Sequence, residues 1–88
     1  MENLIGRFAV SKAGHDAGAV YLVVGHFEEH LLLCDGKYKT QEKPKKKSRK
    51  HVQVLNTSPG EPLYSKLIKN EKIFDHEIKY AIKQYLSN

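Results

Sequence analysis

Lysine and arginine are concentrated in one segment of this 88-residue chain, residues 37–51. The segment reads K-Y-K-T-Q-E-K-P-K-K-K-S-R-K-H, and it holds eight of the 15 Lys and Arg residues but only one of the ten Asp and Glu residues. Its formal charge is therefore about +7, whereas the whole chain carries +5. Each Lys or Arg that meets a phosphate releases condensed counterions, so charge concentrated in this way is typical of a surface that binds a polyanion.

A second candidate contact lies upstream, in the glycine-rich stretch K-A-G-H-D-A-G at residues 12–18. Its two glycines can take left-handed backbone angles, which predicts a tight exposed turn whose backbone can approach a nucleic acid closely. Lys12 and His15 would then contact phosphates. Asp16 would repel a phosphate, so we expect it to organise the turn through its own backbone, or to reach a base edge or a 2′-hydroxyl. A hairpin turn whose glycines serve geometry alone explains the stretch equally well.

Metal-ligating side chains have a spacing that would suit zinc only on a helix. His26, His30 and Cys34 lie four residues apart and would share one helical face. However, Gly25 precedes them and an Asp-Gly pair follows, so the segment reads as a β-hairpin, with the lone Cys34 buried on a strand. We therefore expect no metal and no other cofactor. A paired nucleophile and base, a phosphate-cradling glycine loop and clustered carboxylates are also absent from the sequence, which argues against an enzyme and against a small-molecule substrate.

The elements that would position these residues change character halfway along the chain. The first half has the alternating and β-branched pattern of short strands, and residues 19–24 are apolar enough for both faces to be covered. Asp35-Gly36 predicts a type I′ hairpin, and Pro44 places the basic residues after it in a loop or an edge strand. We expect five strands, at residues 5–11, 19–24, 31–34, 37–42 and 51–55.

In the second half, after the breaker N-T-S-P-G, apolar residues recur at helical spacing. A first short helix is predicted around residues 63–68, and a second follows Asp75 as its candidate N-cap. Lys79 and Lys83 lie off the apolar stripe of the second helix and should face solvent. We therefore predict a mainly β fold with α: a small five-stranded barrel in residues 1–55, followed by two short C-terminal helices in residues 56–88 that pack on it as a single folding unit.

Residues 10–24, V-S-K-A-G-H-D-A-G-A-V-Y-L-V-V, resemble a KOW motif, the glycine-containing β-unit of SH3-like barrels in ribosomal proteins and transcription-elongation factors. With D-G-K-Y-K at 35–39 and P-K-K-K-S-R-K-H at 44–51, the chain is similar to small bacterial KOW-domain RNA-binding proteins and to KOW-bearing large-subunit ribosomal proteins of archaea and eukaryotes. The resemblance covers residues 6–54. It implies an SH3-like barrel and binding to structured RNA, often ribosomal RNA. The chain departs from the family pattern at His15, Ala17 and Lys39, where basic residues, or Arg at 39, are expected.

We therefore expect a monomeric, cytoplasmic, ribosome-associated RNA-binding protein, with ribosomal RNA as its main partner and ribosomal proteins as further candidates. The alternative is a protein-interaction module that docks on a ribosomal or transcription protein, with the basic segment only steering the encounter. No apolar run reaches the ~20 residues of a membrane span, and residues 1–4 do not resemble the start of a signal peptide. Tyr38 is the one aromatic side chain considered for base stacking. The residues expected to contact RNA are Lys12, Gly14, His15, Asp16, Gly18, Lys37, Tyr38, Lys39, Lys43, Lys45, Lys46, Lys47, Arg49, Lys50 and His51.

Overall fold

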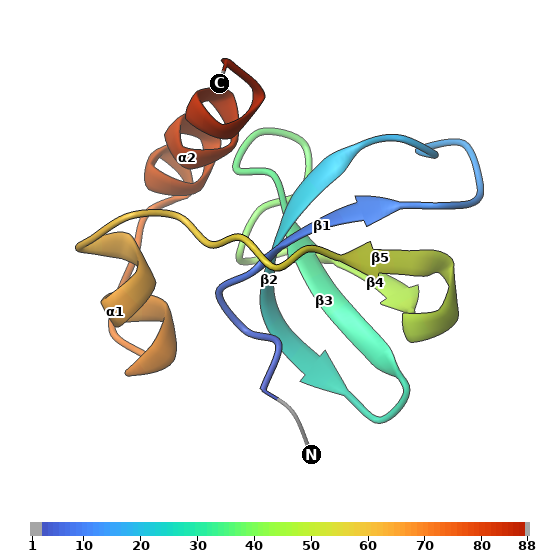
Figure 1. Cartoon of the computed structure of the whole chain (residues 1–88). Coiled ribbons are helices and arrows are strands. Elements are labelled where there is room, and N and C mark those ends of the chain that lie inside the picture. The colour runs from blue at the N-terminus through green and yellow to red at the C-terminus, as the bar shows by residue number, and fades with distance from the viewer. Residues whose placement is uncertain (1–2, 88) are drawn as a thin grey trace.

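A single five-stranded antiparallel sheet forms the body of the protein, and two helices lie on one side of it (Figure 1). The structure, a computed structural model, describes residues 3–87; Met1, Glu2 and Asn88, which belong to the predicted segments, lie outside the described residues. The prediction of a mainly β chain that ends in two helices is confirmed. The elements are β1 (Phe8–Ser11), β2 (Val20–Phe27), β3 (His30–Cys34), β4 (Lys45–Ser48), the 3₁₀ turn η1 (Arg49–His51), β5 (Val52–Val54), α1 (Leu63–Ile68) and α2 (Asp75–Ser87).

The strand order is β4-β3-β2-β1-β5. Strands β1 to β4 follow one another as an antiparallel meander, and η1 then returns the chain so that β5 pairs with β1, with Val52 opposite Ser11. Among the described residues the ladder ends at β4 on one side and at β5 on the other. The sheet is therefore open, and the predicted closure into a barrel is not confirmed.

Both faces of β2 are buried, as its composition predicts. Tyr21 and Val23 point into a cluster formed by sheet residues such as Leu31 and Leu33. Leu22, which alternates with them, points into a second cluster that contains helix residues. The helices thus cover one face of the sheet. On the other face, side chains from the strands of the sheet pack against one another.

The helices bury one apolar stripe each against that first face of the sheet. Leu63 and Leu67 of α1 and Ile78 and Ile82 of α2 join Phe8, Leu22 and Cys34 in one cluster. Asp75, the predicted N-cap, is instead the first helical residue of α2, and its Oδ1 atom accepts hydrogen bonds from Gln41. None of the helices in residues 3–87 has the length and apolar character that crossing a membrane requires.

Two predictions about the strands are wrong. Residues 37–42 form no strand, because the Asp35 carboxylate accepts hydrogen bonds from the backbone N–H groups of Lys37, Tyr38 and Lys39 (2.9, 2.9 and 2.8 Å) and so removes them from any ladder. Asp35-Gly36 therefore opens a broad loop, residues 35–44, instead of a two-residue hairpin. The fourth strand is β4, an edge strand built from the basic residues themselves, which confirms the edge alternative for the segment after Pro44.

The connection predicted at residues 25–30 is also shorter than expected. An irregularity in the pairing between Val23 and Gly25 lets β2 bend and continue to Phe27. The turn itself is confined to two residues, and Glu28 takes a positive φ of 56°. Strand β2 therefore spans eight residues and pairs with β1 along its first half and with β3 along most of its length.

Candidate nucleic-acid interface

The glycine-rich turn and the basic segment lie against each other in the folded chain. The Lys47 ammonium donates to the Asp16 carboxylate (2.9 Å) and to the Ala13 carbonyl (2.8 Å). The Lys12 backbone N–H donates to the His51 carbonyl (2.8 Å). Two stretches more than 30 residues apart therefore form one continuous surface, which we call the basic surface: the turn 12–18, β4 and η1. Figure 1 shows the β1–β2 turn and η1 side by side.

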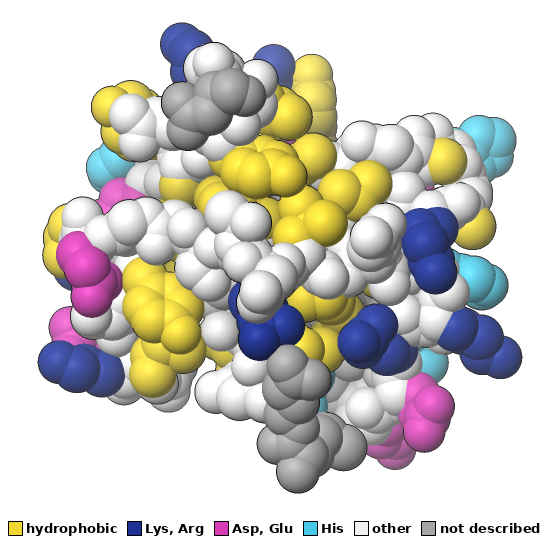
Figure 2. Space-filling view, in the orientation of Figure 1, with side chains coloured by type: hydrophobic (Ala, Val, Ile, Leu, Met, Phe, Trp, Pro, Cys, Tyr) yellow, Lys and Arg dark blue, Asp and Glu magenta, His cyan; other side chains and the backbone are white. Residues whose placement is uncertain are grey.

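Most of the basic surface's cationic side chains are open to solvent. Figure 2 shows Lys, Arg and His side chains gathered at the right of the molecule, where Figure 1 places the turn and η1. Glu28 and Glu29 border this surface, because the Glu29 carbonyl accepts a hydrogen bond from the Arg49 N–H (2.8 Å). The exposed Lys, Arg and His residues of the basic surface are Lys12, His15, Lys46, Arg49, Lys50 and His51.

Asp16 is a structural centre of the turn. Its Oδ1 atom accepts from the Ser11 hydroxyl (2.9 Å) as well as from Lys47, and its Oδ2 atom accepts from the Tyr21 hydroxyl (2.7 Å). The carboxylate thus organises the turn, which agrees with the first of our two expectations for Asp16. It does so through bonds from three side chains and not through a bond to the Asp16 backbone. The Lys47 side chain is only 11% exposed, so its ammonium serves the fold.

The same contacts fix the protonation states of this cluster. Burial by itself raises the pKa of the Asp16 carboxyl, but the hydrogen bonds from Tyr21, Lys47 and Ser11 outweigh burial and hold that pKa well below its usual range. Burial and the bond to an anionic partner both raise the pKa of the Tyr21 phenol. At neutral pH the charges of Lys47 and Asp16 therefore offset each other, and β4 presents less free charge than its sequence indicates.

This network was missed because the strand that carries Lys47 was missed. Side chains alternate between the faces of a strand, so Lys45 and Lys47 lie on the face of Leu33 and Leu31, whereas Lys46 lies on the other face. The Lys46 ammonium sits 4.9 Å from the centre of the exposed Phe27 ring. If K-K-K-S had been treated as a strand, the alternation of side chains would have assigned Lys46 to the opposite face from Lys45 and Lys47.

The two glycines of the turn both have positive φ angles, 89° at Gly14 and 91° at Gly18. A side chain at Gly18 would meet no atom within 4 Å, so the backbone there is open to an approaching ligand. A Cβ atom at Gly14 would lie 3.4 Å from the Lys47 ammonium. The geometry of the turn is therefore as predicted. It is compatible with glycines that serve turn geometry alone and with glycines that let a nucleic acid approach the backbone.

The remaining predicted contacts lie elsewhere, in the 35–44 loop beside α2 (Figure 1). The backbone N–H of Gln41 in this loop donates to the Asp75 carboxylate at the start of α2 (2.9 Å). The Tyr38 side chain is 76% exposed. The predicted residues are thus divided between the basic surface and this loop, which carries Lys37, Tyr38, Lys39 and Lys43.

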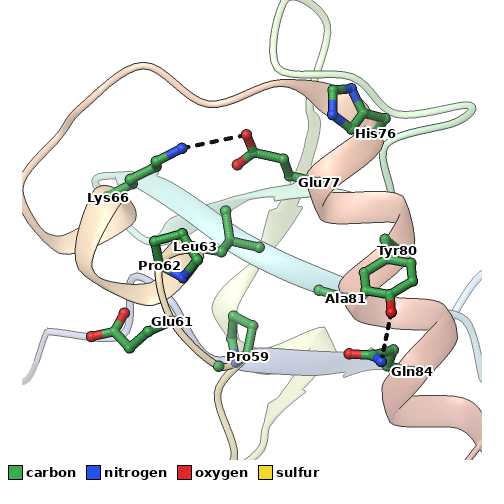
Figure 3. A pocket seen from close by; sticks show the side chains of 11 residues that line it. Pro59, Glu61, Pro62, Leu63, Lys66, His76, Glu77, Tyr80, Ala81 and Gln84 are labelled. Atoms are coloured by element: carbon green, nitrogen blue, oxygen red, sulfur yellow. Dashed lines mark hydrogen bonds and ion pairs between the residues drawn. The ribbon is translucent and has the colours of Figure 1, made fainter.

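Two other features of residues 3–87 bear on chemistry away from these surfaces, a hollow between the helices and the thiol of Cys34. A hollow of about 400 Å³ lies between α1 and α2 (Figure 3), and two pairs of its polar side chains bond to each other: Lys66 with Glu77 at 3.5 Å and Gln84 with Tyr80 at 2.9 Å. No three His, Cys, Asp or Glu side chains gather there or elsewhere in that range to hold a metal ion. Cys34 faces the core, where burial first, and then the charges of Asp75 and Asp35, raise its pKa to about 12.

The resemblance to KOW proteins is carried by short motifs at residues 10–24, 35–39 and 44–51. The turn of the first motif and the basic residues of the third meet in the basic surface, whereas Lys37 and Lys39 of the second lie in the 35–44 loop. No protein-family model matches this chain, and no curated protein matches it at a significant level.

Proposed function

We propose that this protein binds structured RNA, ribosomal RNA first among the candidates, as a small KOW-type protein that acts in the cytoplasm in association with the ribosome. The observation that carries the proposal is the meeting of the glycine-rich turn with the basic segment on one surface. Sequence alone puts these residues more than 30 positions apart. Their contact makes them candidates for a single ligand.

Phosphates are the groups that this surface suits. Lys12, Lys46, Arg49 and Lys50 are exposed, and β4 and η1 hold three of them on ordered backbone, so little freedom is lost on binding. Lysines neutralise phosphates but distinguish bases poorly. We therefore expect affinity to come mainly from the RNA backbone and its shape, with modest sequence preference.

The finer fold assignment belongs to the same proposal. We interpret the sheet as a partly open SH3-like barrel of the KOW type. Two features support this: the strand order, in which β5 returns to β1 through η1, and the Lys47–Asp16 contact, which requires the sheet to curl until β4 approaches the β1–β2 turn.

The test compares charge removal on the basic surface with equal charge removal elsewhere. Arg49→Gln/Lys50→Gln removes two exposed charges of η1, and Lys69→Gln/Lys72→Gln removes two exposed charges from the connection between α1 and α2. Binding of a fluorescent ribosomal RNA fragment is followed by anisotropy over a range of salt concentrations. For four to six phosphate contacts, log affinity should fall with log salt with a slope of about −3 to −5.

The η1 variant should weaken binding and reduce that slope by about 1.4 to 1.8, because each lost phosphate contact removes about 0.7 to 0.9. The Lys69→Gln/Lys72→Gln control should retain the native slope. Co-sedimentation with ribosomes at low and high salt should follow the same pattern. Binding that ignores salt, or equal losses in both variants, would exclude the basic surface as the RNA contact.

The alternative, a protein-interaction module, draws support from the apolar surface of the helical segment. Tyr64, Ile68 and Phe74 are 36 to 50% exposed, and Figure 2 shows apolar side chains over α1. In that case ribosome association would survive high salt and the η1 variant. It would instead be lost on Ile68→Ser/Phe74→Ser.

A further inference from the structure

A second open hollow, of about 430 Å³, lies between the 35–44 loop and α2. Val20, Ile82 and Leu86 supply its apolar lining, and Tyr38 stands at its border with most of its side chain in solvent. We call it the Tyr38 hollow. An exposed aromatic ring beside an apolar floor offers a planar group both a stacking contact and an apolar contact.

Three ammonium groups surround this apolar floor. Lys37 lies with its Nζ atom 4.9 Å from the centre of the Tyr38 ring, and Lys79 and Lys83 line the hollow from α2. No ion pair within residues 3–87 engages any of the three. Lys79 and Lys83 are also four residues apart on the helix, a like-charge spacing that costs free energy unless an anion meets both. The one acidic residue of the lining, Asp35, has its Oδ1 atom bound by three backbone N–H groups.

The loop is fixed to α2 on both sides of Tyr38. Before it, Gly36 approaches α2 so closely that a Cβ atom there would lie 2.3 Å from the Asp75 carbonyl oxygen and 2.6 Å from the Lys79 backbone nitrogen. After it, the Gln41 backbone N–H donates to the Asp75 carboxylate (2.9 Å). The loop backbone that carries Tyr38 is therefore held beside α2 before any ligand arrives, which limits the entropy lost on binding.

We propose that the Tyr38 hollow receives one unstacked base of the bound RNA, which stacks on Tyr38 while its flanking phosphates meet Lys37, Lys79 and Lys83. This inference rests on the proposed function and extends it to α2. Phosphate contacts on the basic surface do not distinguish paired from unpaired RNA, whereas a base must leave its helix to enter a hollow. The site therefore gives the protein a preference for loops, bulges or ends of structured RNA.

The experiment uses two labelled probes: an RNA hairpin with a single-stranded loop, and a fully paired RNA duplex with the same number of phosphates. Dissociation constants are measured by anisotropy at one salt concentration for the native chain, Tyr38→Leu and Tyr38→Phe. Leucine keeps apolar bulk and removes the ring, whereas phenylalanine keeps the ring. Because Tyr38 is 76% exposed, neither substitution threatens the core.

The native chain should bind the hairpin more tightly than the duplex. Tyr38→Leu should weaken hairpin binding about 5- to 150-fold, the range of one base–aromatic stack, and leave duplex binding unchanged. Tyr38→Phe should bind the hairpin as tightly as the native chain does, because it keeps the ring. Lys79→Gln/Lys83→Gln should also weaken hairpin binding more than the Lys69→Gln/Lys72→Gln control does.

Different failures would separate the two proposals. If the native chain binds neither probe, RNA binding itself is wrong. If it binds both probes alike and Tyr38→Leu changes neither affinity, the basic surface still binds RNA and the base site is wrong. A loss of equal size for hairpin and duplex in Tyr38→Leu, or a hollow that takes an apolar peptide and no base, would equally overturn the base site.

Discussion

At the scale of single residues, Asp16 shows how one carboxylate sets both the shape and the charge of a candidate binding surface. Ser11, Tyr21 and Lys47 all donate hydrogen bonds to it, and its side chain is only 19% exposed. Without the carboxylate's charge, the Lys47 ammonium would stay largely buried with no anionic partner. We therefore expect the turn 12–18 to depend on Asp16 more than on any interaction with RNA.

Asp16→Asn should lower the free energy of unfolding at neutral pH by about 2 kcal/mol, the scale of hydrogen bonds to a charged group. Since folding lowers the pKa of Asp16, its stabilisation is complete above the unfolded value of about 3.9 and is lost progressively as pH falls from there through the lower pKa of the folded state. The difference between the urea midpoints of native and variant chains, measured by circular dichroism, should therefore narrow between neutral pH and about pH 3.

Glu42→Gln is the matched control, because it removes one carboxylate charge from an exposed side chain. It should shift the free energy of unfolding by no more than about 0.5 kcal/mol. A native chain and an Asp16→Asn variant of equal stability at neutral pH would show that the network contributes nothing.

At the scale of elements, the 35–44 loop depends on a close contact that only glycine allows. Gly36 and Gly18 both have positive φ, 80° and 91°, but only Gly36 faces backbone atoms of α2. Gly18→Ala should cost about 1 to 2 kcal/mol from backbone strain alone. Gly36→Ala should cost clearly more, because Asp75 and Lys79 must move as well.

The difference in free energy of unfolding between Gly36→Ala and Gly18→Ala measures the contribution of the contact between the loop and α2. It is obtained from urea unfolding of both variants under the same conditions. Equal losses of stability would mean that the loop yields without disturbing α2. Such a result would also weaken the argument that Tyr38 is held in place before RNA binds.

The elements also show where sequence reasoning succeeds and where it ends. Strands β1, β2, β3 and β5 and both helices carry apolar residues at the period of their structure, and the sequence locates them within a few residues. Strand β4 has no such pattern: K-K-K-S has low intrinsic strand propensity and forms because β3 offers an edge to pair with. The contact within the candidate site could not be predicted for a similar reason: the partner of Lys47 lies 31 residues away in sequence, and no local pattern indicates it.

At the scale of the whole molecule, one cluster joins both halves of the chain. Cys34 of β3 packs in it with residues of β1 and β2 and of both helices, and it is fully buried. With a pKa of about 12 and no access to solvent, its thiol should resist a disulfide reagent in the native state.

Reaction of Cys34 with such a reagent therefore reports the opening of this cluster. If residues 1–55 and 56–88 form a single folding unit, the reaction rate should rise with urea in parallel with the loss of the circular-dichroism signal. Reaction at urea concentrations where the sheet remains intact would show that the helices detach first. The segments would then be separate units.

Strand β4 has one further consequence, because it lies at the end of the sheet and pairs only with β3 among the described strands. An open strand edge can recruit the same edge of another copy and seed aggregation, and lysines placed there bring like charges together when two copies approach. The residues that we propose for RNA contact thus also keep the free protein soluble. Substitutions in η1 leave this protection in place, whereas neutralising Lys46, the exposed lysine of β4, would favour self-association of a chain that keeps the Lys47–Asp16 contact.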